Sequence, residues 1–487
     1  MLFVVCLLPV CLVVVLRGVP LSRGAVTPRT GPPATGLSPV FTGLSPVATG
    51  IGPVFPNRIG RFCGQGGAAR LFFVSLRGTG PLGPDIVILK TRLNMEIKEN
   101  IFYVGVNDRV KHRFEGLWRL PQGVSYNSYL IVDEKVALVD TVDVAFFAEY
   151  LEKIRAVLGE RPVDYLIINH MEPDHSGSLS LIRQFYPGIR LVGNRKTFEM
   201  VQGFYGVPTE GDVLVADGDK LSLGRRELTF YLAPMLHWPE TMVSFVAEEG
   251  ILFSGDAFGC FGALNGAVLD TQMDTAAYWP EMERYFASIL GKFRAPVRTA
   301  LRKLGGLDIR MICSTHGPVW TAEAPRAVET YRRLAHGETE EGLVVCYGSM
   351  YGNTQRVAEA VAEGAAQEGL KKIIVHNLSV SQPSFVLADI FRYSGLAIGG
   401  PTYNGGLFPV VEDLLRRLAG REVAGHKLAY FGGFTWAPAA VKTITAYNEQ
   451  MKMDLVADPL EWKQGPSGAT LESARALGAA LARAVCD

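Results

Sequence analysis

The sequence predicts a protein of two α/β domains that follow about ninety residues of a different character. The chain has 487 residues, of which 48% are hydrophobic and 20% charged, whereas single hydrophobic cores stop growing at roughly 250–300 residues. From Met95 onward, short β-rich runs are separated by turns and amphipathic helices. After His336 strands and helices alternate regularly, which is typical of a parallel, doubly wound sheet.

Charge and cysteine usage exclude several classes of function. The 48 basic and 48 acidic side chains cancel, so no long-range field attracts nucleic acid or a membrane surface, and we expect neither as a partner. The seven cysteines are odd in number and contain no C-x-x-C pair. This pattern favours a reducing compartment, here the cytoplasm, and excludes a fused rubredoxin or zinc-ribbon module.

Residues 1–94 are predicted to be a disordered, low-complexity leader. Residues 1–16 are almost wholly apolar, but no basic residue precedes them and the run is shorter than the roughly 20 residues that span a bilayer. A seven-residue repeat at 35–55 carries Gly and Pro in every copy, which prevents helix or ladder formation. The abrupt start of periodic sequence at Met95 favours translation from there, with the upstream stretch an artefact of the gene prediction. A cleaved leader is the alternative.

The first domain is predicted at residues 95–338 and begins with strands and one well-marked helix. We expect strands at 129–132 and 137–139, then a helix near 145–158. Apolar side chains recur in that helix at spacings of three and four, so one face should be buried. The residues of this face are Phe147, Tyr150, Leu151, Ile154, Val157 and Leu158.

Potential metal ligands follow four apolar strands of this domain. The strand expected at 163–168 is followed by four ligands within six residues, and the apolar runs 228–236, 251–255 and 309–314 each lead to one more. The seven candidates are His170, Glu172, Asp174, His175, His237, Asp256 and His316. Unpaired polar groups at apolar strand ends would cost on the order of 1–3 kcal/mol each, so the arrangement favours a metal site.

The order and spacing of these seven residues resemble the flavodiiron family. The resemblance implies a metallo-β-lactamase-like αββα sandwich and a catalytic, non-haem di-iron centre. Relatives that hydrolyse with zinc have histidine at the position of Glu172, and a carboxylate there gives a harder ligand set that suits iron. By position, one iron would be held by His170, Glu172 and His237, the other by Asp174, His175 and His316, and Asp256 would bridge them.

The second domain is predicted at residues 339–487, with strands at 343–347, 373–375, 396–400 and 428–431. Three loops follow carboxyl ends of these strands, where ligands of open α/β sheets bind. The first precedes a helix whose amino terminus suits a phosphate monoester. The candidate residues are Ser349, Met350, Tyr351, Gly352, Asn353 and Thr354 in the first loop, Pro401, Thr402, Tyr403, Asn404 and Gly405 in the second, and Gly433, Phe434, Thr435 and Trp436 in the third.

Together these loops resemble those of flavodoxin, which implies bound FMN. Tyr403 or Trp436 would stack against the isoalloxazine ring, and core packing is the alternative for these two aromatic side chains. The segment after Trp436 has Pro438 and alanines where the family usually has serine and glycines, so the contacts of the third loop should depart from the family pattern.

Both resemblances lie in family order over residues 95–487. They imply an oxidoreductase that reduces dioxygen to water, nitric oxide to nitrous oxide, or both. Electrons would come from a separate, rubredoxin-like donor, and chains would pair head to tail as homodimers or dimers of dimers. The first alternative is a zinc-dependent metallo-β-lactamase-superfamily hydrolase with a flavodoxin module. The second is a flavodoxin-type carrier with an inactive metal domain, against which the complete ligand set argues.

Overall fold

The computed structural model describes residues 2–7, 10–15, 72–77, 85–90 and 95–486. Before Met95 the described strands form two antiparallel hairpins. One consists of β1 (Leu2–Leu7) and β2 (Val10–Val15), the other of β3 (Phe72–Arg77) and β4 (Asp85–Lys90). The repeat at 35–55, predicted to be disordered, lies outside the described residues. Among the helices that the structure does describe, none combines the length and apolar character needed to cross a membrane.

Two β-sheets form the centre of the first domain. The larger has the strand order β15-β14-β13-β12-β11-β6-β5 and the smaller β16-β17-β18-β19-β20. The larger comprises β5 (Met95–Lys98), β6 (Ile101–Tyr103), β11 (Tyr129–Val132), β12 (Val136–Val139), β13 (Tyr165–Ile167), β14 (Arg190–Gly193) and β15 (Val213–Leu214). The smaller comprises β16 (Lys220–Ser222), β17 (Glu227–Leu232), β18 (Met242–Val246), β19 (Ile251–Gly255) and β20 (Met311–Ser314). Tyr129 of the larger sheet meets Phe253 of the smaller, with ring centroids 5.4 Å apart, so the two sheets pack face to face.

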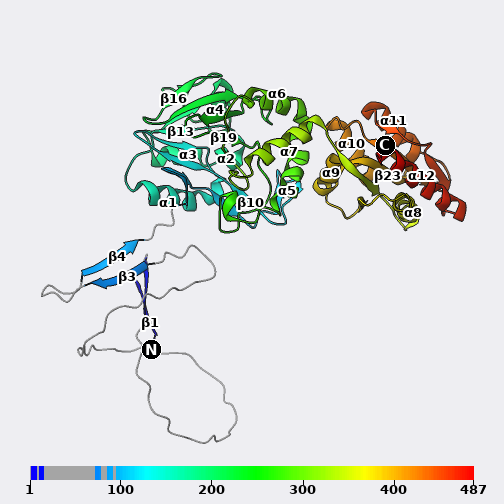
Figure 1. Cartoon of the computed structure of the whole chain (residues 1–487), viewed down its shortest axis with the longest axis horizontal. Helices are drawn as coiled ribbons and strands as arrows, with labels where there is room; N and C mark the ends of the chain where they lie inside the picture. The colour runs from blue at the N-terminus through cyan, green and yellow to red at the C-terminus, as the bar shows by residue number, and fades with distance from the viewer. Residues whose placement is uncertain (1, 8–9, 16–71, 78–84, 91–94, 487) are drawn as a thin grey trace, which may run out of the picture. The chain divides into compact units, whose positions relative to one another are not determined.

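Helices complete the predicted αββα sandwich (Figure 1). Strands β12 to β15 are parallel neighbours, as are β19 and β20, and parallel neighbours require crossover helices that cover a sheet face. These helices are α1 (Phe147–Leu158), α3 (Leu179–Phe185), α4 (Arg195–Tyr205), α5 (Tyr278–Tyr285), α6 (Arg294–Leu304) and, after β20, α7 (Ala324–His336). Tyr150, Leu151 and Ile154 are buried on α1, on the face that the sequence predicted.

Short strands and helical turns complete this domain. Two small antiparallel pairs are β7 (Val106–Asp108) with β10 (Val124–Tyr126), and β8 (Arg113–Phe114) with β9 (Trp118–Arg119). The helical pieces are α2 (Pro173–Ser176), η1 (Val144–Phe146), η2 (Asp270–Gln272), η3 (Phe286–Leu290) and η4 (Gly291–Phe293). Of these, α2 matters most here because it carries two of the candidate ligands.

The second domain is a doubly wound sheet, as predicted. Its parallel strands have the order β22-β21-β23-β25-β26, and β27 pairs with β25, which is the flavodoxin-like order. The strands are β21 (Glu340–Tyr347), β22 (Ile373–Asn377), β23 (Tyr393–Tyr403), β24 (Gly406–Leu407), β25 (Lys427–Phe434), β26 (Asp454–Leu455) and β27 (Leu460–Lys463). The helices are α8 (Asn353–Gln367), α9 (Pro383–Arg392), α10 (Pro409–Gly420), α11 (Ala440–Met451) and α12 (Gly468–Cys486).

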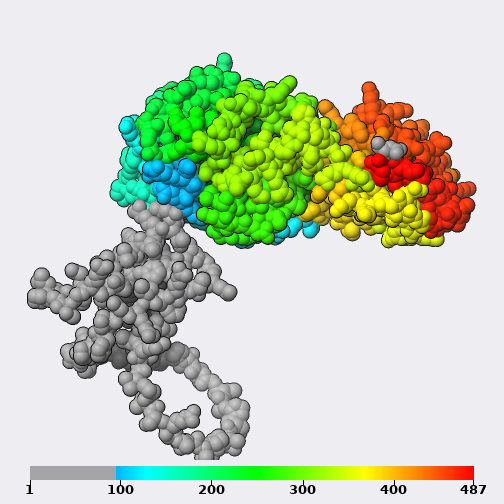
Figure 2. Space-filling view, in the orientation of Figure 1, coloured from blue at the N-terminus to red at the C-terminus, as the bar shows by residue number. Residues whose placement is uncertain are grey.

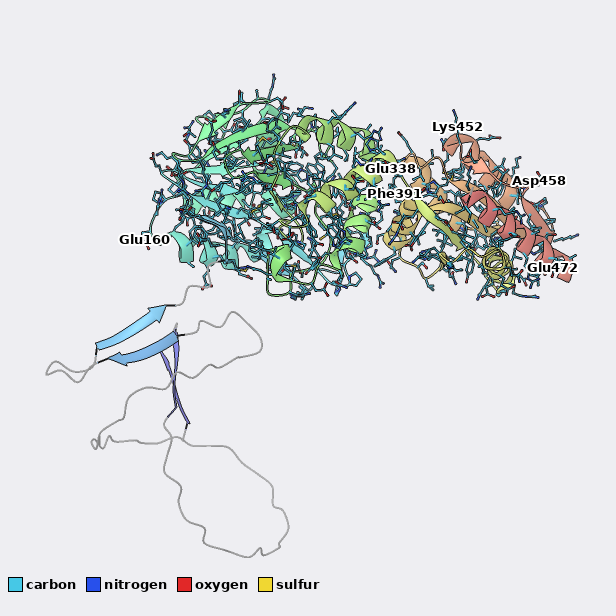
Figure 3. The ribbon with its side chains drawn as sticks, viewed as in Figure 1. Glu160, Glu338, Phe391, Lys452, Asp458 and Glu472 are labelled. Carbon is cyan, nitrogen blue, oxygen red and sulfur yellow. The ribbon has the colours of Figure 1, made fainter. Side chains whose placement is uncertain are left out.

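A short link joins the first domain to the second. Helix α7 ends at His336, Gly337 has a φ of +72°, and β21 begins at Glu340, so the boundary predicted after residue 338 falls within this link. Figure 3 labels Glu338 in the link and Phe391 on α9. The Arg294 guanidinium of α6 lies 5.6 Å from the Phe391 ring centroid. Figure 2 shows the surface of residues 95–486 in colour.

Several strand ends differ from the sequence prediction, among them three that lead to the candidate sites. Strand β17 ends at Leu232 rather than 236, because Pro234 lacks an N–H and Met235 has a φ of +65°. Strand β23 extends to Tyr403 and pairs back with β24, so part of the second flavin loop is a strand end. Strand β25 likewise continues to Phe434.

Candidate metal centre and flavin site

Strand ends bring all seven candidate ligands to one buried site. His170 and Glu172 follow β13, and Asp174 and His175 lie in α2, which Pro173 begins. The other three follow β17, β19 and β20. His237 is reached by a turn rather than directly from its strand. All seven side chains are buried: His170, Glu172, Asp174, His175, His237, Asp256 and His316.

One group of four donor atoms surrounds a common point. His237 Nε2 lies 3.1 Å from Glu172 Oε2 and 3.1 Å from Asp256 Oδ2. His170 Nε2 lies 3.4 Å from each of the same two oxygens. Donor atoms held about 2.1 Å from one ion lie roughly 3.0–3.5 Å apart, so this spacing fits a single metal ion.

A second group of donor atoms shares Asp256 with the first. The Oδ1 atom of Asp256 lies 2.9 Å from His175 Nε2 and 3.6 Å from His316 Nε2. Asp174 presents Oδ1 to His175 and Oδ2 to His316, each at 3.4 Å. The two oxygens of Asp256 therefore face different histidine pairs, which is the geometry of a carboxylate bridge between two metal ions.

Unpartnered polar atoms show that these residues fit a metal pair. Within the described residues, His170 Nε2, His316 Nε2, both oxygens of Asp174 and both ring nitrogens of His175 are buried and make no hydrogen bond. Buried polar groups ordinarily find a partner, and the Nε2 and carboxylate atoms among these turn toward the same small region. A site of four imidazoles and three carboxylates suits iron chemically.

Outer residues that sequence reasoning missed orient the ligands. Glu240 Oε1 lies 2.9 Å from His170 Nδ1, and the Ser125 carbonyl lies 2.7 Å from His316 Nδ1. Thr315 donates its hydroxyl to Asp256 Oδ1 at 2.6 Å. Asp140, at the end of β12, accepts the Asn169 backbone N–H at 2.8 Å. The one available signal was position, because Glu240 lies three residues after His237 and Thr315 directly precedes His316.

Burial and neighbouring charges shift the pKa values of these groups in opposite directions. Burial would raise the pKa of Asp256, but the imidazoles of His175 and His170 outweigh it and hold that pKa well below its ordinary value. For Asp174 burial prevails over the attraction of His175 and raises the pKa to about 7. Burial, reinforced by His175, lowers the pKa of His316 to about 4. Carboxylates and imidazoles packed this closely are stabilised by a bound cation.

Aromatic rings enclose the site on the side of His316. The ring centroids of Phe114, Tyr285 and Tyr126 lie 5.3, 5.6 and 6.1 Å from that of His316, and all three side chains are buried. Such a wall excludes bulk water and strengthens electrostatic interactions inside the site.

The first predicted flavin loop joins β21 to α8. Ser349 Oγ accepts the Gly352 N–H at 3.1 Å, and Gly352 precedes α8 with a φ of +88°. Helix α8 therefore begins directly behind the loop, and its first backbone N–H groups lack partners within the helix. This geometry suits a phosphate group.

The second and third loops are tied to each other. Thr402 Oγ1 accepts the backbone N–H groups of Ala439 and Ala440 at 3.0 and 3.1 Å, so its hydroxyl oxygen caps α11. Tyr403 is 41% exposed and Trp436 84% exposed. Two aromatic side chains this exposed do not belong to the core, which favours the stacking interpretation over core packing.

Comparisons with known proteins find matches in both predicted domains. A family model described as "ODP family beta lactamase" matches residues 124–317, and one described as "Flavodoxin" matches residues 345–478. A nitric oxide reductase of Moorella thermoacetica is 32% identical over 397 residues, which cover 80% of this chain and 98% of the relative. An anaerobic nitric oxide reductase flavorubredoxin of Vibrio vulnificus is 30% identical over 396 residues, which cover 80% of each.

Two solved structures share the fold along most of the chain. The rubredoxin oxygen:oxidoreductase of Desulfovibrio gigas superposes with a TM-score of 0.78 at 28% identity, covering 81% of this chain and 98% of the other. The flavodiiron protein of Giardia intestinalis superposes with a TM-score of 0.77 at 29% identity, covering 81% and 97%.

Proposed function

The chain belongs to the flavodiiron protein family, and we propose that it reduces dioxygen, nitric oxide or both with electrons that pass through FMN to two iron ions. The observation that carries this proposal is the pair of ligand groups that share Asp256. Reduction of dioxygen to two waters consumes four electrons and four protons. Reduction of two nitric oxide molecules to nitrous oxide and water consumes two of each.

In this proposal His170, Glu172 and His237 would hold the first iron, and Asp174, His175 and His316 would hold the second. Asp256 would be shared between them. The inclusion of His175 is supported by its Nε2 atom, which lies 2.9 Å from Asp256 Oδ1 and 3.4 Å from Asp174 Oδ1. The wall of Phe114, Tyr126 and Tyr285 keeps bulk water from the small gas substrate.

Bound FMN and the iron pair supply the electron transfers, and the protein supplies their placement. In the second domain, the loop at 349–354 would bind the FMN phosphate at the start of α8. The loops at 401–405 and 433–436 would flank the isoalloxazine, with Tyr403 and Trp436 as the exposed rings available for stacking.

The hydrolase alternative is disfavoured by Glu172. This side chain contributes Oε2 to the first group at 3.1 Å from His237 Nε2, where a zinc hydrolase ordinarily has an imidazole. A third carboxylate lowers the free energy of the ferric state, whereas redox-inert zinc gains nothing comparable from it.

The finer features of the function rest on the family resemblance. We infer a separate, rubredoxin-like electron donor, a head-to-tail homodimer or dimer of dimers, and a cytoplasmic location. In such a dimer the FMN of one chain would lie beside the iron pair of the other. The relatives named above support this donor class, since one is a rubredoxin oxygen:oxidoreductase and another a flavorubredoxin.

Anaerobic stopped-flow mixing of the reduced protein with each gas tests the proposal. We expect oxidation of FMN and iron by dioxygen, by nitric oxide or by both, with water or nitrous oxide as the product. A reduced, iron-loaded protein that neither gas oxidises would contradict it. Sedimentation of the FMN-loaded protein tests the dimer separately.

A further inference from the structure

Glu240 connects the two loops that surround the first iron position. It lies three residues after His237, yet its Oε1 atom lies 2.9 Å from His170 Nδ1 and accepts the Met171 backbone N–H at 2.9 Å. Its backbone carbonyl accepts a hydrogen bond from the Asn194 side chain at 2.5 Å. Hydrogen bonds thus hold both the Oε1 atom and the backbone of Glu240, and its side chain is 0% exposed.

This contact determines which nitrogen of His170 is available to a metal. A carboxylate oxygen only accepts hydrogen bonds, so Nδ1 of His170 must carry the proton. Nε2 is then left with its lone pair, and it is this atom that lies 3.4 Å from both Glu172 Oε2 and Asp256 Oδ2. Hydrogen bonding to a carboxylate also makes an imidazole a stronger donor to its metal.

At the second iron position, neither of the two histidines donates its Nδ1 proton to a carboxylate within the described part of the chain. The Nδ1 atom of His316 donates to the neutral carbonyl of Ser125 at 2.7 Å. The Nδ1 atom of His175 has no hydrogen-bond partner among the described residues. The two positions therefore differ in the acceptor behind their imidazoles, a carboxylate at the first and a neutral carbonyl or no described partner at the second. Because Glu240 is buried, water does not screen its charge.

On the basis of the proposed function, we propose that Glu240 is a positioning residue that fixes His170 toward the first iron and makes that iron the easier of the two to oxidise. Glu240 contacts Nδ1 of His170, on the side of the ring away from the donor atom Nε2. Its carboxylate contacts the imidazole of His170 and the neighbouring Met171 N–H, so its influence should appear in metal affinity and redox potential, and at one iron only.

The test compares Glu240→Gln with Glu240→Ala. Glutamine keeps the shape and can accept both hydrogen bonds without the charge, whereas alanine removes the contact. Glu199→Gln is the matched control, because Glu199 pairs with Arg195 on the exposed surface of α4. Cobalt(II) titration of the metal-free protein in competition with a chelator measures affinity without requiring iron or activity. Circular dichroism and FMN content establish that each variant is folded.

We expect Glu240→Gln to bind two cobalt ions, with one of them about 10- to 100-fold weaker than in the unmodified protein. In the iron-loaded protein, the midpoint potential of the first oxidation should rise, by about 59 mV for each tenfold loss of ferric over ferrous preference. Mössbauer spectra should change for one iron only. Glu240→Ala should lose one metal ion, and Glu199→Gln should leave every measurement unchanged.

Unchanged cobalt affinity and an unchanged potential in folded Glu240→Gln would overturn this inference. So would equal changes at both irons, since they would indicate a general loss of structure at the site. The proposed function fails by a different result, namely an unmodified protein that binds no iron or reduces neither gas.

Discussion

Asp256 places its Oδ1 atom 2.9 Å from Nε2 of His175, while its other oxygen faces the opposite group of ligands at 3.1 Å from His237 Nε2. Replacing Asp256 with asparagine keeps one oxygen and loses the second. We therefore expect Asp256→Asn to lose one metal ion per chain and most gas reduction, and to retain FMN. Metal analysis by mass spectrometry measures the loss. Asp308→Asn, at an exposed carboxylate, is the control, and full metal content in Asp256→Asn would contradict the bridge.

Glu172→His should change the metal rather than the fold. Histidine at this position restores the ligand type of the zinc-dependent relatives and removes a negative charge from the first group. The variant should take up zinc in preference to iron and stop reducing either gas. FMN should remain bound, because its predicted loops lie in the second domain. Zinc and iron contents of protein from iron-replete cells decide the matter, and a variant that keeps iron and activity would show that Glu172 does not select the metal.

A protein that begins at Met95 should fold, bind both cofactors and turn over normally. The Gly- and Pro-rich repeat at 35–55 offers no periodic apolar face to bury, whereas β5 already starts at Met95 and pairs with β6. Thermal unfolding and iron content of the shortened and full-length chains make the comparison. Loss of metal or activity on shortening would reject this prediction.

NADH alone should reduce the FMN slowly or not at all. The chain lacks a C-x-x-C pair for an iron–sulfur centre of its own, and we infer that a separate rubredoxin-like protein delivers the electrons. Anaerobic absorbance at the flavin band follows the reduction, first with NADH and then with a reduced rubredoxin added. Rapid reduction by NADH in the purified protein would contradict the prediction.

Thr402 should control FMN affinity through the helix that it caps. Thr402→Val removes the acceptor for the N–H groups of Ala439 and Ala440, a loss of about 1 kcal/mol for a helix cap, and loosens the loop that bears Trp436. We expect roughly fivefold weaker FMN binding by flavin fluorescence titration. Thr402→Ser should restore it and iron content should stay constant. Equal FMN affinity in Thr402→Val would exclude this role.

Most of the fold was predictable from the sequence because its strands are apolar and its helices amphipathic. The strands at 129–132 and 251–255 have the predicted bounds, and α1 buries the predicted face. Strand β17 was predicted too long, because the apolar run 228–236 continues through Pro234 although the regular pairing of β17 with β18 ends at Leu232. Apolar character alone does not reveal where a strand loses its partner.

The seven candidate ligands were identifiable since each follows an apolar run, whereas the residues that support them were not. Glu240, Ser125 and Thr315 contact the ligands through distances set by tertiary packing. Apart from the nearness of Glu240 and Thr315 to a ligand in the sequence, nothing distinguishes them from surface polar residues. The Thr402 cap was likewise hidden, because Ala439 lies far from it along the chain.

Metal content combined with anaerobic gas consumption tests the central claim most directly. Protein purified from iron-replete cells should contain two iron ions and one FMN per chain. After reduction, it should consume dioxygen, nitric oxide or both without accumulating peroxide. Two zinc ions in the purified protein, together with no gas reduction after reconstitution with iron, would contradict the assignment of this site as a di-iron reductase.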